Sequence, residues 1–216
     1  MKCITSELTL ETPKPLTVHP EKLRGFIASK HLGESLYHQH TKNGLQYRYP
    51  LIHYHILNGK ATITGWLNGV EETKKLFQQI DHLSIGDTHH LVIGKKLVIT
   101  KQEFGLTDNL HRYRFVSPWL ALNKNNYSKY MHLKGDTRKF LEKILIGNIL
   151  SASKGLNYIV EGEIKASMVY ARQIQSKVKG TPLFAFQGIF ETNFNLPDFF
   201  GLGKSVSRGF GAVRRV

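Results

Sequence analysis

The chain has 216 residues, of which 41% are hydrophobic, and its mean hydropathy of −0.27 predicts a globular protein with a buried core. These values exclude wholesale disorder, and no apolar run approaches the ~18 residues of a membrane-spanning helix. The formal net charge of +14 favours nucleic acid as the partner over an anionic membrane surface. The only cysteine, Cys3, excludes an internal disulfide framework and cysteine-based zinc motifs. Because Glu7 precedes any apolar segment, we expect no signal peptide and a cytoplasmic protein.

Charge is divided unevenly between the two halves of the chain. Residues 1–108 carry 13 basic and 10 acidic side chains, net +3, together with nine of the 11 histidines. Residues 109–216 carry 17 basic and 6 acidic side chains, net +11. Because domains cluster near ~100–150 residues, we predict two domains with these boundaries, the first rich in imidazoles and the second strongly basic.

Hydrophobic periodicity and turn residues predict the elements of the first half. The Asn58-Gly59 pair is typical of a β-hairpin turn, and Asn68 with Glu71 indicates a capping box at the start of a helix. In chain order the predicted elements are a strand over 4–10, a helix over 20–32, strands over 46–57 and 60–67, a helix over 68–80 and a strand over 95–104. This order is that of a ferredoxin-like unit.

The second half begins with the same order of elements. We predict a strand over 112–122, a polar stretch over 123–126, a helix over 137–153 and strands over 158–164 and 183–190. The fold class is therefore α+β, with two tandem ferredoxin-like (RRM-like) units. The second unit has a degenerate second helix and a C-terminal glycine-rich loop. Gly105, Asp108 and Asn109 form turns readily and place the join near 105–110.

The most specific motif lies near the C-terminus, where Gly201-Leu202-Gly203 and Gly209-Phe210-Gly211 flank five residues. Glycine permits positive φ and close approach of another backbone. Successive exposed N–H groups beside Lys204 and Arg208 would form a nest for a phosphate. The spacing matches neither a Walker A loop nor a dinucleotide-binding fingerprint. The alternative is a structural, glycine-rich bulged hairpin at a sheet edge.

Two histidines, His38 and His40, stand close together in the loop that follows the first predicted helix. Residues at i and i+2 of an extended segment point the same way, and imidazoles titrate near neutrality, so the pair can supply one base and one acid. Lys30 and Tyr47 are near enough in the sequence to stabilise developing charge. One alternative is a loop with incidental surface histidines. The other is a zinc site completed by members of the set His53, His55, His89 and His90.

These motifs resemble a known family. The glycine-rich segment 201–211 and Phe115-Val116-Ser117-Pro118-Trp119 resemble the repeat-associated RNA-binding superfamily of CRISPR systems. Three further segments are similar to the CRISPR repeat-cleaving endoribonucleases that carry two histidines in this loop. They are Leu23-Arg24-Gly25-Phe26, Tyr37-His38-Gln39-His40 and Tyr47-Arg48-Tyr49-Pro50-Leu51-Ile52. Members of that family cut the precursor CRISPR transcript within each repeat, without metal, and release guide RNAs.

The resemblance implies a metal-independent endoribonuclease without a cofactor, acting on CRISPR repeat RNA in the precursor transcript. The 2′-OH of the RNA would attack the adjacent phosphorus and leave 2′,3′-cyclic phosphate and 5′-OH ends. The catalytic residues implied are His38, His40, Lys30 and Tyr47. The RNA-binding residues expected are Gly201, Gly203, Lys204, Ser207, Arg208, Gly209, Gly211, Arg214, Arg215 and Arg48.

The rival function is that of a non-catalytic RNA-binding subunit of a CRISPR ribonucleoprotein. A metal-dependent nuclease is disfavoured because the 16 carboxylates are scattered along the chain. The sequence leaves open a CRISPR effector complex as a further partner and the choice between a monomer and a homodimer.

Overall fold

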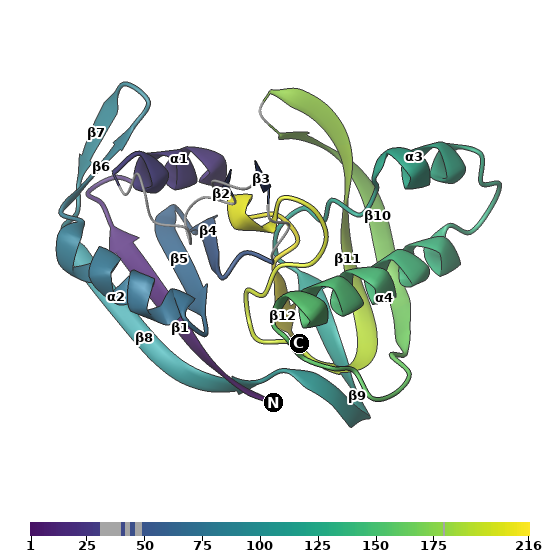
Figure 1. Ribbon diagram of the computed structural model, residues 1–216. Helices are drawn as coiled ribbons and strands as arrows, with labels where there is room; N and C mark the ends of the chain where they lie inside the picture. Colours follow the sequence, from purple (N-terminus) through teal and green to yellow (C-terminus); the bar gives the residue numbers. More distant parts are fainter. Residues whose placement is uncertain (31–39, 42–43, 46–48, 179) are drawn as a thin grey trace. The chain divides into compact units, whose positions relative to one another are not determined.

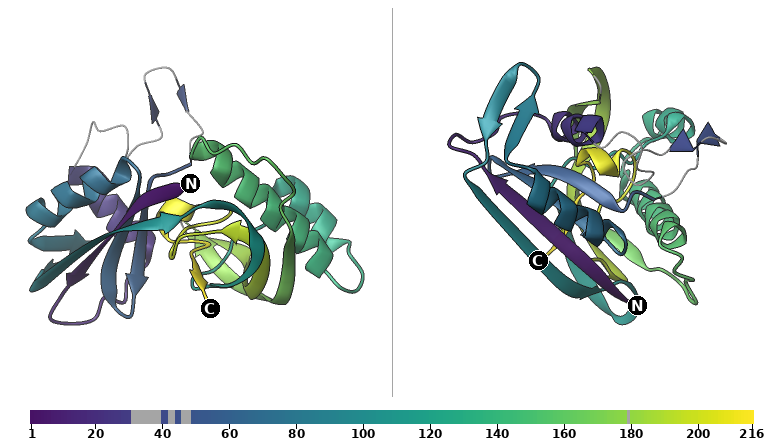
Figure 2. Two further views of the ribbon diagram at one scale, coloured as in Figure 1. Left: turned by 90° about the horizontal axis from the view of Figure 1, so that it is seen from below. Right: turned by 60° about the vertical axis from the view of Figure 1, so that its left-hand side comes forward.

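The computed structural model describes residues 1–30, 40–41, 44–45, 49–178 and 180–216 and divides into two compact units (Figure 1). The N-terminal unit consists of Lys2–Gln102 together with Ser207–Gly209. The C-terminal unit consists of Met1, Glu103–Val206 and Phe210–Val216. Each unit contains one four-stranded sheet, and helices lie against one face of that sheet (Figures 1 and 2).

The N-terminal sheet has the strand order β4-β5-β1-β8. Taken as first to fourth strand along the chain, this is the order second, third, first, fourth, which a ferredoxin-like unit produces. The elements of this unit are β1 (Lys2–Glu11), α1 (Pro20–Lys30), β4 (Ile52–Leu57), β5 (Lys60–Trp66), α2 (Gly69–Gln79) and β8 (Gly94–Glu103). Two short hairpins are added to it, β2 (His40–Thr41) with β3 (Gly44–Leu45) and β6 (His82–Ile85) with β7 (Thr88–Leu91).

Local sequence signals account for most of this unit. Leu23, Phe26 and Ile27 lie on the buried side of α1, as their spacing predicts. The hairpin between β4 and β5 turns at Asn58 and Gly59, whose φ angles of 50° and 74° are those of a left-handed turn. The predicted capping box is wrong, because Asn68 adopts a helical conformation and its side chain forms no cap hydrogen bond.

The two faces of the N-terminal sheet differ in chemistry. Ile52 and Tyr54 of β4 belong to the apolar core beneath the helices. Successive residues of a strand point to opposite faces, so His53 and His55 lie on the other face, where both are buried. Burial lowers the pKa of His55 to about 4, because the charged imidazolium would lose its hydration there.

The C-terminal sheet is antiparallel, with the order β10-β11-β9-β12, which again follows second, third, first, fourth. Its elements are β9 (Gly105–Phe115), α3 (Lys124–Met131), α4 (Arg138–Gly155), β10 (Ala166–Val178), β11 (Thr181–Asn195) and β12 (Val213–Arg215). One short 3₁₀ turn, Val206–Arg208, replaces a second helix. The prediction of two ferredoxin-like units with a degenerate second helix is therefore confirmed.

Three details of the second half differ from the sequence prediction. Residues 105–110 are not a turn, because they begin β9, and Phe104 alone separates β8 from β9. Gly105 is needed for a different reason, since a Cβ there would lie 2.5 Å from the Tyr158 hydroxyl. No strand is present over 158–164 within this described stretch, and the strand of this region, β10, runs over 166–178. The polar stretch at 123–126 opens α3, with the Asn123 side chain accepting a hydrogen bond from the Asn126 N–H.

The pH dependence of folding should carry the signature of buried His55. In the unfolded chain this imidazole gains a proton near pH 6.5, whereas in the native protein it stays neutral down to about pH 4. Its contribution to the free energy of unfolding is therefore full above pH 6.5 and is lost as pH falls towards 4, by about 3 kcal/mol. Urea unfolding of the wild type and of His55→Gln at pH 7 and pH 4.5 should show a smaller loss in the variant. The control His89→Gln, in exposed β7, should retain the wild-type loss, and equal losses in all three proteins would contradict the assignment.

Candidate functional site

The glycine-rich segment 201–211 is largely an internal part of the fold. Gly201, Gly209 and Gly211 are buried, and Gly211 has a φ of +67°. A Cβ at Gly211 would overlap the carbonyl oxygen of Leu202. Gly203, at φ +92°, leaves no room for a Cβ either, which would lie 2.8 Å from the Trp119 indole nitrogen. These glycines are therefore required by backbone geometry and close packing.

Hydrogen bonding within the segment corrects one part of the sequence prediction. The N–H groups of Leu202, Lys204 and Gly211 donate to the carbonyl oxygens of Gly211, Leu120 and Pro118. These three N–H groups belong to the internal hydrogen-bond network, so they do not form the predicted nest of successive exposed donors. The Lys204 side chain, in contrast, is exposed.

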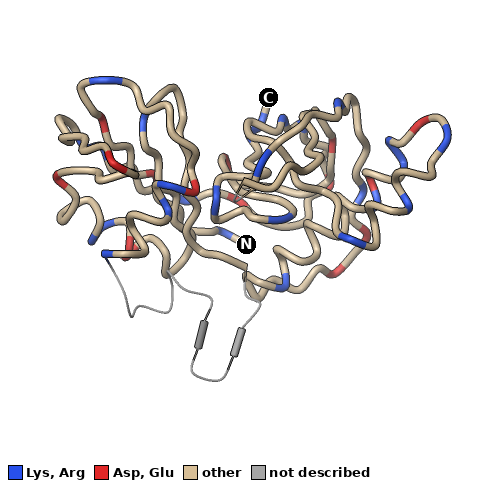
Figure 3. Tube along the Cα trace, turned by 90° about the horizontal axis from the view of Figure 1, so that it is seen from above, with Lys and Arg blue, Asp and Glu red and all other residues tan. Residues whose placement is uncertain are grey.

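Lys204 lies exposed on this segment in the C-terminal unit. Its Nζ is 3.5 Å from the Leu122 carbonyl oxygen, and its backbone N–H donates to Leu120 at 3.2 Å. Both contacts are with the connection that follows β9, so the ammonium group is positioned by the fold rather than by another charge. Lysines and arginines occur in both units, and several lie on the helices and loops of the C-terminal unit (Figure 3).

Arg208 belongs to the N-terminal unit by its contacts, as do Ser207 and Gly209. Burial lowers the pKa of Arg24, on α1, and the positive charge of Arg208 lowers it further. Two guanidinium groups within electrostatic reach of one another form a local centre of positive charge. Arg24 was not predicted as a site residue. Its charge alone gave no signal, because only the fold brings the C-terminal segment beside α1.

Arg214 and Arg215, two further predicted RNA-binding residues, both have interaction partners. Arg214 lies 3.7 Å from Asp198 and over the ring of Phe199, and Arg215 donates to Nδ1 of His111. Both are on β12 and exposed. Exposed ion pairs of this kind contribute ~0–1 kcal/mol, so Arg214 remains able to exchange its partner for a phosphate.

The histidine loop is only partly within the described residues. His38, Tyr47 and Arg48 lie outside them, and His40 is described only as a backbone position in β2. Lys30 is the last residue of α1, where its ammonium group lies 3.2 Å from Nε2 of His82 and 5.0 Å from the ring centroid of Phe26. In the sequence, Lys30 comes directly before the segment that carries the histidine pair.

Neither a cluster of metal ligands nor a membrane-spanning helix is found among the described residues. There, no group of three or more His, Cys, Asp or Glu side chains is arranged to hold a metal ion. His53 and His55, which were candidate ligands in the alternative zinc site, are buried in the N-terminal sheet. In the same part of the chain, every helix is too short or too polar to cross a membrane.

Comparison with known proteins covers both units. A family model for the Cas6b N-terminal domain matches residues 1–103, and one for the Cas6b C-terminal domain matches residues 105–216. The chain belongs to the Cas6b family. The resemblance to the CRISPR repeat-cleaving endoribonucleases is thereby confirmed, and the family boundary falls where β8 gives way to β9.

Individual Cas6b relatives agree with this assignment. A crystal structure of Cas6b is 32% identical, covers 100% of both chains and superposes with a TM-score of 0.90. A second, described as the CRISPR RNA processing endoribonuclease Cas6b, is 28% identical over 99% of this chain and 100% of its own, with a TM-score of 0.78. An uncharacterized protein of Methanocaldococcus jannaschii is 41% identical over 143 residues, which are 66% of this chain and 97% of that protein.

Replacement of Gly203 should show that the glycine-rich segment is a structural element. Gly203→Ala combines a residue at φ +92° with a Cβ 2.8 Å from Trp119, and strain of this kind costs about 1–3 kcal/mol. The free energy of unfolding, from denaturant titration, should fall by about 1–3 kcal/mol. Gly147→Ala, in α4, has open space around the new Cβ and should stabilise the protein by about 0.5–1 kcal/mol. A Gly203→Ala protein as stable as the wild type would contradict this assignment.

Proposed function

We propose that this protein is an endoribonuclease that cuts precursor CRISPR RNA within its repeats and releases guide RNAs. The observation that carries the proposal is the match of both units to the Cas6b family. One similar structure is described as a CRISPR RNA processing endoribonuclease. The excess of positive charge in the second half, net +11 over residues 109–216, supports a polyanionic substrate.

The proposed reaction needs only the RNA and proton transfers. A base removes the proton of a ribose 2′-OH, whose oxygen attacks the adjacent phosphorus. The bond from phosphorus to the 5′-oxygen of the next nucleotide breaks, and an acid donates a proton to that oxygen. The products are a 2′,3′-cyclic phosphate and a 5′-OH, with no metal required. His38 and His40 are assigned as the base and acid, and each proton transfer contributes about 10²–10⁴ in rate.

Lys30 and Tyr47 are proposed to assist the histidines. The Lys30 ammonium group ends α1, immediately before the segment that contains His38, and it is exposed. A cation in this position can offset the additional negative charge of the phosphorane as it forms. Tyr47 is assigned the same kind of role by its hydroxyl group.

RNA binding is assigned to the cations around the glycine-rich segment and on β12. Lys204, Ser207 and Arg208 are supplied by the segment, and Arg24 stands beside Arg208. Arg48, Arg214 and Arg215 complete the proposed set. Gly201, Gly203, Gly209 and Gly211 contribute by fixing the shape of the segment rather than by touching RNA, since their Cα positions are packed against other parts of the fold.

The chemistry is tested with two substrates that differ in one atom. Repeat RNA should be cleaved in the presence of EDTA and leave 2′,3′-cyclic phosphate and 5′-OH ends. The same RNA with a single deoxyribose at the cut site should bind equally well and remain intact, because the attacking oxygen is missing. Cleavage and end groups are read by denaturing gel and end-labelling. A strict requirement for Mg²⁺, or cleavage of the deoxy substrate, would exclude this mechanism, and binding without cleavage would favour the non-catalytic subunit.

The histidine pair is tested by single-turnover rates. If His38 and His40 act together in one transition state, each alanine substitution should remove most of the rate, and the double variant should be scarcely slower than the slower single variant. The wild-type rate should be bell-shaped between pH 5 and 9, because it requires one protonated and one neutral group. His90→Ala, in β7, is the matched control and should cleave like the wild type. A large loss for only one of the two variants would instead make the other histidine a support of the loop.

A further inference from the structure

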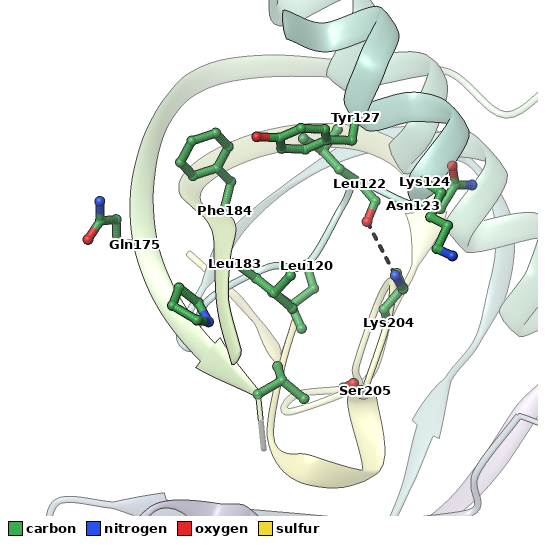
Figure 4. A pocket seen from close by; sticks show the side chains of 12 residues that line it. Leu120, Leu122, Asn123, Lys124, Tyr127, Gln175, Leu183, Phe184, Lys204 and Ser205 are labelled. Carbon is green, nitrogen blue, oxygen red and sulfur yellow. Dashed lines mark hydrogen bonds between the residues drawn. The ribbon is translucent and has the colours of Figure 1, made fainter. Parts of the chain in front are cut away.

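A cavity of about 540 Å³ opens within the C-terminal unit, on the side of the sheet that carries α3. Its walls are mostly apolar and come from the connection after β9, from α3, and from the ends of β10 and β11. The volume lies in the range of about 300–1,000 Å³ that is usual for small-ligand sites. One end is closed by the glycine-rich segment, which contributes Lys204 and Ser205 (Figure 4).

An aromatic pair forms one wall of this cavity. Tyr127 of α3 and Phe184 of β11 are stacked, with ring centroids 5.7 Å apart and an interplanar angle of 29°. Figure 4 shows both rings on one side of the cavity and the lysine side chains on the other. Tyr127 is 44% exposed, so the pair offers an accessible aromatic surface and is not fully buried in the core. Such a surface is what an unpaired nucleobase stacks on.

The charges around the cavity have one sign. Lys124 and Lys204 line it, together with the uncharged polar residues Asn123 and Gln175. A second cavity of about 420 Å³ adjoins it and shares Asn123 and Lys204. The second cavity is lined by two more lysines, Lys129 and Lys143, and by amide side chains. An apolar metabolite or a lipid chain would leave these cations unused, whereas a nucleotide chain carries both an aromatic base and anionic phosphates.

We propose that the first cavity is a subsite for one unpaired nucleotide of the RNA. Its base stacks on the Tyr127–Phe184 pair and its phosphates lie against Lys124 and Lys204. The strand continues across Lys204 into the second cavity, where Lys129 and Lys143 meet the next phosphate. This inference rests on the proposed function for the identity of the natural RNA, but it does not depend on cleavage.

The subsite explains a feature of α3 that folding alone does not. Every residue of this helix is at least partly exposed, so it contributes little to the core. It is nevertheless held in place by Tyr130. The Tyr130 hydroxyl donates to the Gln173 side chain at 3.0 Å, and the centroid of its ring lies 5.5 Å from that of Phe186. An exposed, well-anchored helix that presents Tyr127 and Lys124 on the cavity side is suited to binding.

The experiment measures binding of a single-stranded RNA heptamer of mixed sequence, which requires neither a repeat nor cleavage. Stacking of a base on an aromatic ring strengthens single-strand binding, so Tyr127→Ala should raise the Kd about tenfold. Tyr127→Phe keeps the ring and should bind like the wild type. Tyr170→Ala, an exposed tyrosine of β10 outside the cavity, is the matched control and should also bind like the wild type. If Tyr127→Ala proves unstable in a thermal melt, Leu183→Glu at the exposed rim replaces it and should give a similar loss.

A second arm locates the base in repeat RNA. Each nucleotide in turn is replaced by an abasic one, and the Kd is measured with wild type and with Tyr127→Ala. One position should weaken wild-type binding and have no further effect in the variant. Additive losses at every position, or equal affinities of Tyr127→Ala and wild type for the heptamer, would overturn the proposal. So would tight binding of free AMP that the heptamer does not displace. Failure of wild type to cleave the repeat would refute the proposed function alone, since the heptamer arm still decides the subsite.

Discussion

The burial of Trp119 is the constraint on which the C-terminal unit depends. Its indole N–H donates to Asn148 at 3.0 Å, and its backbone exchanges two hydrogen bonds with Phe186. Its ring stacks on Phe115, with centroids 4.8 Å apart. A buried tryptophan whose polar atom is satisfied fixes its surroundings in one arrangement. Gly203 packs directly against this ring, so the position of the neighbouring Lys204 follows from the core and not from a flexible loop.

The distribution of carboxylates shows how positive charge is left available. The pKa of Asp136 is lowered to about 2 by hydrogen bonds from Arg138, and Glu191 accepts a hydrogen bond from Arg112 at 2.7 Å. Asp198 is near Arg214. Three of the six acidic residues in the second half are thus engaged with arginines. Four lysines line the two cavities, Lys124, Lys129, Lys143 and Lys204, and no carboxylate is among the described residues of either lining. Exposed lysines gathered without acidic neighbours favour a polyanion over a folded protein partner.

The sequence predicted those parts of the fold that local patterns determine. The apolar spacing in α1, the Asn58-Gly59 turn and the apolar run of β11 were enough to identify a ferredoxin-like order twice. The sequence-based prediction was wrong where contacts between residues far apart in the chain determine the local structure. Strand β10 was missed because residues such as Arg172 and Gln173 give it a polar sequence without the alternation typical of a strand. The strand is stabilised by its long antiparallel pairing with β11, which the local sequence does not reveal. Gly105 was assigned to a turn because the ring of Tyr158, 53 positions later, is not visible from its neighbours.

The candidate site was predictable only in its residue types. Glycine pairs flanking cations drew attention to 201–211, but sequence could not show that Leu202, Lys204 and Gly211 use their N–H groups internally. Nor could it show that Tyr127 and Phe184, far apart along the chain, stack beside Lys204.

Arg24 and Arg208 bring two positive charges together in the N-terminal unit. The pKa of Arg24 is lowered first by burial and then by the positive charge of Arg208. Because an arginine does not lose its proton at physiological pH, both charges persist in the folded protein. The two residues stand 184 positions apart in the sequence, so only the fold creates this concentration of charge. Under the proposed function, it is a place where a phosphate would be attracted to the protein.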